Sequence, residues 1–170
     1  MTPTSRPLQP IMWIGGPVAL CAVATVVLAL PLRAWTLQLP EPVFGFAPAF
    51  AWAVVRPSIL PPLALLALGL FQDLWWGTPL GFWAVVFLSL HGVVLIMRTS
   101  LSGQDFWVLW GWFAAGCAMA LSVGVVLATL GAGTVPNLLG VAAQWSVSIM
   151  MYPFAYRLID RYEDADVRFR

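Results

Sequence analysis

In residues Leu63–Met97, LALLALGLFQDLWWGTPLGFWAVVFLSLHGVVLIM, two apolar runs long enough for membrane helices meet at a short corner. Gln72 and Asp73 lie at the end of the first run, so this polar pair belongs to a helix end in or near the membrane. A carboxylate is costly in that setting and usually has a purpose. The corner is therefore the first candidate for a functional site.

Residues suited to a tight connection between two helices follow directly after Asp73. Gly77 can end the first helix with a positive φ, Thr78 can N-cap the next helix, and Pro79 suits its first turn. Two roles for Asp73 stay open. The carboxylate either braces the corner through the exposed amides that begin the next helix, or it contacts a partner or ligand.

The composition predicts an all-α, polytopic membrane protein. Of the 170 residues, 61 % are hydrophobic and 9 % are charged, and the mean hydropathy is +0.89, outside the range of soluble domains. The net charge of +1 comes from few, scattered basic residues, so no nucleic-acid partner is expected. Cys21 and Cys117 lie in apolar runs and are expected to be buried thiols. With a single histidine and no cysteine cluster, no metal or cofactor is expected.

The chain divides into a polar lead (1–10), a transmembrane domain (11–155) and a charged cytoplasmic tail (156–170). About six spans are predicted, each near the length that crosses a bilayer. The second is ambiguous, because Val43–Val55 is short for a span and the longer alternative contains Pro40 and Glu41. The predicted spans are Ile11–Leu32, Trp35–Val55, Leu63–Trp76 (with Leu60 as an alternative start), Leu80–Met97, Phe106–Leu130 and Val135–Ala155.

Arginine placement predicts the orientation of the bundle. With six spans and a cytoplasmic N-terminus, seven arginines lie inside and only Arg33 lies outside. A five-span arrangement without the second helix also gives seven to one, so charge alone does not choose between them. Both arrangements put the Gln72–Pro79 corner outside and the C-terminus in the cytoplasm. The seven inside arginines of the six-span arrangement are Arg6, Arg56, Arg98, Arg157, Arg161, Arg168 and Arg170.

Small residues recur every four positions in the predicted fifth span, at Gly116, Ala120 and Gly124. They line one helix face and allow a neighbouring backbone to approach closely. Packing within the bundle and a dedicated contact with another protein are both open interpretations of this face.

Three polar residues inside the predicted spans complete the candidates: His91, Asn137 and Gln144. For His91, an interhelical hydrogen bond is the simpler interpretation, with a proton relay as the alternative. No local Ser/His/Asp or Cys/His combination and no glycine-rich phosphate loop is found, so the chain is not expected to be an enzyme.

The run GLFQDLWWGTPLG, Gly69–Gly81, resembles the signature of the MreD family of rod-shape-determining membrane proteins. That signature is a Gly-Leu-Leu-x-Asp run followed by a corner similar to Gly-x-Pro-Leu-Gly. Further similarities are AWAVVRP at Ala51–Pro57, the basic Arg98 after the next helix, and YPFAYRLIDR at Tyr152–Arg161. The chain departs from the pattern at Phe71-Gln72 and in its acidic tail.

The resemblance implies a non-enzymatic component of the bacterial cell-elongation machinery in the inner membrane. Such proteins are associated with MreC, a periplasmic scaffold, and act with MreB, RodA and a transpeptidase in lateral peptidoglycan synthesis. The resemblance also favours six spans and a fold similar to the substrate-binding components of energy-coupling-factor transporters. A small-solute binding component of a transporter is the alternative. The expected partner surface is Gln72, Asp73, Gly77, Thr78, Pro79 and Gly81.

Overall fold

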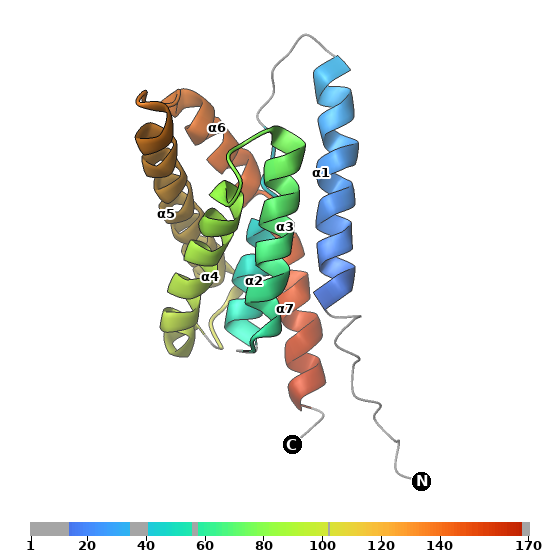
Figure 1. Ribbon diagram of the computed structural model, residues 1–170. Helices are drawn as coiled ribbons and strands as arrows, with labels where there is room; N and C mark the ends of the chain where they lie inside the picture. Colours follow the sequence, from blue (N-terminus) through green and yellow to red (C-terminus); the bar gives the residue numbers. More distant parts are fainter. Residues whose placement is uncertain (1–13, 35–40, 56–57, 102, 168–170) are drawn as a thin grey trace.

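The computed structural model describes residues 14–34, 41–55, 58–101 and 103–167, and all regular elements among them are helical (Figure 1). Apolar stretches separated by Gly, Pro and short polar corners account for this order of helices. The helices are α1 (Gly16–Ala34), α2 (Phe46–Val55), α3 (Leu60–Trp76), α4 (Phe82–Leu101), α5 (Phe106–Ala132), α6 (Leu138–Ile149) and α7 (Tyr152–Val167).

Within the described residues, three helical segments are long and apolar enough to cross a membrane: Phe82–Leu101, Phe106–Ala132 and the combined segment Leu138–Asp160. Shorter apolar helices accompany them, including α2 and α3. The structure is therefore that of an all-helical chain with the features of a membrane protein, as the composition predicts.

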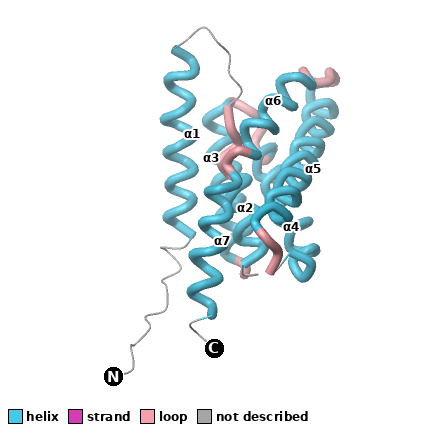
Figure 2. The backbone as a smooth tube through the Cα atoms, turned by 180° about the vertical axis from the view of Figure 1, so that it is seen from behind, coloured by secondary structure: helices cyan, strands magenta, loops and turns pink. Residues whose placement is uncertain are grey.

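The shortest helix occupies the centre of the bundle. Nine of the ten residues of α2 are buried, and α3, α4 and α7 pack around it. Two aromatic contacts join it to its neighbours: Phe46 meets Phe87 of α4 at 5.9 Å between ring centroids, and Phe50 meets Phe113 of α5 at 5.3 Å. In contrast, α1 stands at the edge of the bundle beside α3 in both views (Figure 2).

The predicted second span is wrong in its longer form where the structure describes it. Residues 41–45 are not helical, and α2 begins only at Phe46. The remainder of that prediction, residues 35–40, and the predicted lead, residues 1–10, lie outside the described residues. An extended segment therefore leads into the bundle, and ten residues of helix span only about 15 Å.

The predicted sixth span, Val135–Ala155, is broken into α6 and α7 by a turn at Met150 and Met151. Pro153 explains the break, because proline has no amide hydrogen and its ring excludes the carbonyl four residues earlier. That carbonyl, on Ile149, instead accepts a hydrogen bond from Trp110 Nε1 at 3.3 Å. Helix α7 continues to Val167, so the predicted start of the tail at Tyr156 lies inside a helix.

Candidate functional site

The α3–α4 corner is built around the carboxylate of Asp73, which is only 1 % exposed. Asp73 Oδ1 accepts hydrogen bonds from Thr78 Oγ1 at 2.7 Å and from the Trp83 amide at 3.0 Å. Oδ2 accepts from the Gly81 amide at 2.7 Å. Because Gly81 and Trp83 open α4, a side chain at the end of one helix caps the start of the next.

Two roles were open for Asp73, and this geometry corresponds to bracing of the corner rather than to contact with a partner or ligand. Both carboxylate oxygens accept backbone hydrogen bonds, which compensate for burying the charge. A cationic group of a partner would reach this carboxylate only if the corner opened. Any direct recognition at the corner must therefore use other residues.

Thr78 is not the N-cap of the next helix, and Pro79 does not lie in its first turn. Helix α4 begins at Phe82 rather than Leu80, and Thr78 donates to Asp73 instead of capping α4. The capping prediction for Thr78 is wrong because the carboxylate of Asp73 already accepts the amides at the helix start. The prediction for Gly77 is confirmed: it ends α3 with φ 68°, and Gly81 also has a positive φ of 93°.

Two glycine-dependent contacts hold helices close to α4. A Cβ on Gly69 of α3 would lie 2.4 Å from the Cα and the amide nitrogen of Ala84, so the α3 and α4 backbones are in direct contact. Gly69 lies within the motif quoted above, but the sequence did not mark it as a packing residue. On α5, a Cβ at Gly116 would lie 2.7 Å from Leu90 Cδ1.

The small-residue face of α5 meets α4 within the bundle. Ala120 is fully buried, and Gly124 lies against Phe82 and Val86 of α4. A Cβ on Gly124 would meet these two side chains at 3.4 Å, a distance close to ordinary van der Waals contact. Of the two interpretations, packing within the bundle describes the observed position of this face.

Side chains of α4 hold the buried helix α2 through its backbone. His91 Nδ1 lies 3.0 Å from the carbonyl of Ala49, and since a carbonyl only accepts, Nδ1 carries the hydrogen. One turn before the end of α4, Arg98 donates to the carbonyls of Val54 at 2.9 Å and Val55 at 3.1 Å. Arg98 therefore caps the C-terminal end of α2, where unpaired carbonyls favour a cation.

The extended segment before α2 is held by α6 and α1. Ser148 Oγ accepts from the buried Val43 amide at 3.0 Å, and Gln144 Nε2 donates to the Glu41 carbonyl at 3.4 Å. The Cys21 thiol contacts the Phe44 carbonyl at 3.6 Å. Non-helical backbone inside a membrane bundle needs such partners, because no bulk water is present to replace them.

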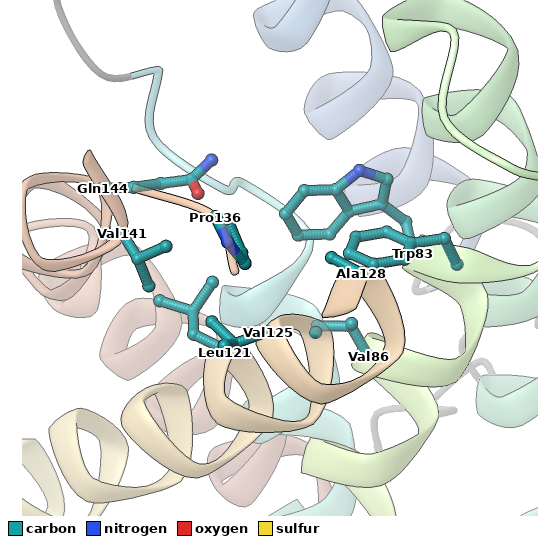
Figure 3. A pocket seen from close by; sticks show the side chains of 10 residues that line it. Trp83, Val86, Leu121, Val125, Ala128, Pro136, Val141 and Gln144 are labelled. Carbon is teal, nitrogen blue, oxygen red and sulfur yellow. The ribbon is translucent and has the colours of Figure 1, made fainter. Parts of the chain in front are cut away.

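Two adjoining hollows, which share lining residues, lie at the end of the bundle that carries the α3–α4 corner, and Figure 3 shows the one between α4, α5 and α6. The polar cavity is a shallow, largely open hollow of about 300 Å³ and is lined by Glu41, Trp76, Trp83 and Gln144. The apolar pocket, of about 120 Å³, lies between α4, α5 and α6. Trp83 and Gln144 line both hollows. The remaining residues of the apolar pocket are Phe82, Val86, Leu121, Gly124, Val125, Ala128, Pro136 and Val141.

The predicted polar residues do not converge on one site. His91 faces α2, Gln144 faces the polar cavity and the Glu41 carbonyl, and Asn137 is an exposed N-cap whose Oδ1 accepts from the Leu139 amide. Gln72 of the expected partner surface is buried, with 2 % exposed. Between Gln72 and Leu80 the exposed residues are Leu74 on the last turns of α3 and, after the helix, Gly77, Pro79 and Leu80.

Three residues with clear structural roles were not identified as site residues from the sequence: Arg98, Ser148 and Trp83. The sequence marks Arg98 as a basic residue after a span, and not as a hydrogen-bond donor to another helix. Serine and tryptophan are common in membrane helices, so neither carries a signal without a known neighbour.

None of the family models, curated proteins or solved structures compared with the chain matches it.

Proposed function

We propose that this chain is a non-enzymatic integral membrane component of the bacterial cell-elongation complex, similar to MreD, that binds an MreC-like scaffold. In this role it supports lateral peptidoglycan synthesis and cell shape, and acts indirectly with MreB, RodA and a transpeptidase. The protein lies in the inner membrane, among its lipids, and has a cytoplasmic C-terminus.

The observation that carries the proposal is the construction of the corner that carries the resemblance. Gly69 permits the contact with α4, Asp73 joins α3 to the start of α4, and Gly77 ends α3 in a left-handed conformation. Each of these residues has a structural role that few other residue types can fill. A signature made of such residues fits a rigid corner that presents a fixed surface to another protein.

The arrangement of charges and helices supports the proposed topology. The α3–α4 corner and the C-terminal end of α7 lie at opposite ends of the bundle, and Arg98 lies at the end of α4 away from the corner (Figure 1). The six membrane crossings of the proposal are α1, α3, α4 and α5, together with two composite ones. One composite crossing is α2 with the extended segment before it, and the other is α6 with α7. A six-helix fold similar to the substrate-binding components of energy-coupling-factor transporters is part of the proposal.

Leu80 is the best candidate for a partner contact at the corner. Its side chain is 72 % exposed, although it sits beside the buried brace. A large exposed apolar side chain on a rigid turn suits a membrane-anchored partner. Leu139, which is 81 % exposed near the start of α6, offers a matched control at the same end of the bundle.

Affinity purification from mild detergent tests the proposal. We expect the wild-type chain and Leu139→Arg to recover an MreC-like protein, and Leu80→Arg to lose it while keeping normal membrane abundance. Recovery of no MreC-like protein by the wild-type chain would refute the proposed function. Equal recovery by both arginine variants would remove Leu80 from the interface.

A transporter component is the second candidate, and the polar cavity is the observation that favours it. Binding components present convergent polar groups around a pocket, and about 300 Å³ is at the small end for such sites. This function predicts that the same purification recovers ATPase and transmembrane coupling subunits instead of a scaffold.

A further inference from the structure

The polar cavity brings together groups of two kinds. Glu41 and Gln144 are half-buried at its wall, and Trp76 and Trp83 form an edge-to-face pair with ring centroids 4.8 Å apart. A glutamate that lines the same hollow as two indole rings suits an ammonium group, which gains both charge pairing and cation–π attraction.

The same two tryptophans have hydrogen-bond donors without an acceptor. The Nε1 atoms of Trp76 and Trp83 are buried and have no partner among the described residues, and the Trp83 side chain is only 5 % exposed. A buried indole N–H usually finds a partner. In Figure 3, the indole nitrogen of Trp83 and the amide nitrogen of Gln144 lie on the same side, away from Leu121 and Val125. Together these donors suit an anionic oxygen.

The neighbouring apolar pocket suits the hydrocarbon part of the same molecule. It shares Trp83 and Gln144 with the polar cavity and is otherwise lined almost entirely by apolar side chains. It lies where α4 and α6 make little contact with each other, although both pack on α5. A volume of about 120 Å³ holds the beginning of an acyl chain, and the rest of the chain extends along the helices.

We propose that the polar cavity and the apolar pocket together bind one phosphatidylethanolamine molecule. The indole N–H groups of Trp76 and Trp83 donate to its phosphate, as does the second N–H of the Gln144 amide, whose other N–H donates to the Glu41 carbonyl. The Glu41 carboxylate accepts from its ammonium. An anionic headgroup such as phosphatidylglycerol lacks the ammonium and meets the like charge of Glu41. A choline headgroup lacks the ammonium hydrogens. The proposal is independent of the function proposed above.

Native mass spectrometry of the detergent-purified full chain tests the site with three lipids: palmitoyl-oleoyl phosphatidylethanolamine, phosphatidylglycerol and phosphatidylcholine. For the wild type we expect a one-to-one adduct with phosphatidylethanolamine at least tenfold stronger than with phosphatidylglycerol, which corresponds to one well-formed charged contact. Adducts with phosphatidylcholine should be intermediate. Equal adducts with all three lipids would overturn the proposal.

Two conservative variants separate the headgroup contacts. Trp83→Phe keeps a ring but removes the N–H, and we expect about a fivefold loss of the phosphatidylethanolamine adduct, equivalent to one hydrogen bond. Glu41→Gln should remove the preference over phosphatidylglycerol. Trp112→Phe and Asp105→Asn are the controls, since neither residue lines the two hollows, and both should behave as wild type. Wild-type lipid preference in both cavity variants would refute the assignment.

The apolar pocket provides a third, separate test. Ala128→Phe, at a half-buried position, should fill the pocket and lower the phosphatidylethanolamine adduct without altering the headgroup contacts. Water-soluble phosphoethanolamine should not displace the lipid. Displacement by that compound, together with unchanged binding in Ala128→Phe, would assign the polar cavity to a free solute and overturn the lipid proposal.

Discussion

Two interruptions of helical structure in this bundle are stabilised in opposite ways. At the α3–α4 corner, Asp73 accepts hydrogen bonds from residues five to ten positions later in the chain. At the segment that leads into and forms α2, the partners are far away in sequence. Arg98 reaches Val54 across 44 residues and Ser148 reaches Val43 across 105 residues.

The difference separates a local unit from one that depends on the assembled bundle. The corner needs only α3 and α4, which also meet through Gly69. Helix α2 is too short to span a bilayer and is buried by residues of α4, α5 and α7. We therefore expect the corner to stay formed when the contacts of α2 are weakened. We also expect α2 to stay formed when the corner is damaged.

The largest effect is expected from Gly69→Leu, because its Cβ would overlap the backbone of Ala84. The α3 and α4 backbones would have to separate, at a cost in the exceptional range above about 4 kcal/mol. Fluorescence-detected size-exclusion chromatography should show little folded protein. Gly92→Leu on α4 is the control, since a Cβ there meets nothing within 4 Å. Equal folding of both variants would refute the close α3–α4 contact.

Asp73→Leu should have the next largest effect. It removes the acceptor of three hydrogen bonds and leaves two amides at the start of α4 unpaired, a loss of about 2–6 kcal/mol at 1–3 kcal/mol per buried group. Asp73→Asn should lose about half as much, because each oxygen of Asp73 accepts from a backbone amide and asparagine has only one oxygen.

Hydrogen–deuterium exchange shows whether that damage stays local. In Asp73→Asn, exchange should rise at Gly81–Val85 and remain unchanged in α2. A comparable rise in α2 would mean that the corner and the buried helix form one cooperative unit. The distinction between the two regions would then fail.

Arg98→Leu tests the opposite region. It removes two donors to the carbonyls that end α2, and about 1–3 kcal/mol of stability should be lost, within the range for charged hydrogen bonds. Exchange should rise in α2 while the corner stays protected. Arg157→Leu is the control, because Arg157 is exposed. An equal shift of the melting temperature in both variants would show that the hydrogen bonds from Arg98 to the end of α2 do not stabilise the protein.

The contrast also explains which features were predictable from the sequence. The left-handed Gly77 and the bracing alternative for Asp73 followed from residues close together in the chain. The prediction for Thr78 was wrong, because Thr78 and Asp73 are both suited to accept the amides at the start of α4 and the spacing alone does not decide which of them does so.

The centre of the bundle depends on contacts that the sequence does not display. The apolar composition of residues 43–55 does not indicate whether they span the membrane or form a short helix in the core. Hydrogen bonds with Arg98, His91 and Ser148 hold this segment as a short buried helix. Their partners are backbone carbonyl and amide groups, which every residue type except proline has, so the sequence does not reveal them. The break after Ile149 was foreseeable from Pro153, whereas the Trp110 donor that occupies the freed carbonyl was not.

The smallest effect is expected from Ser148→Ala, and it is the most selective test of the extended segment. Ser148 donates to the Gln144 carbonyl within α6 and accepts from the buried Val43 amide. Alanine leaves that amide unpaired, so about 0.5–1.5 kcal/mol should be lost, as for side-chain hydrogen bonds inside membrane bundles. Ser146→Ala is the matched control, because Ser146 is exposed and bonds only the Ala142 carbonyl of its own helix. If exchange near Val43 becomes faster in Ser148→Ala and not in Ser146→Ala, the extended segment is held in place by α6. Identical exchange in both variants would show that Val43 does not depend on Ser148.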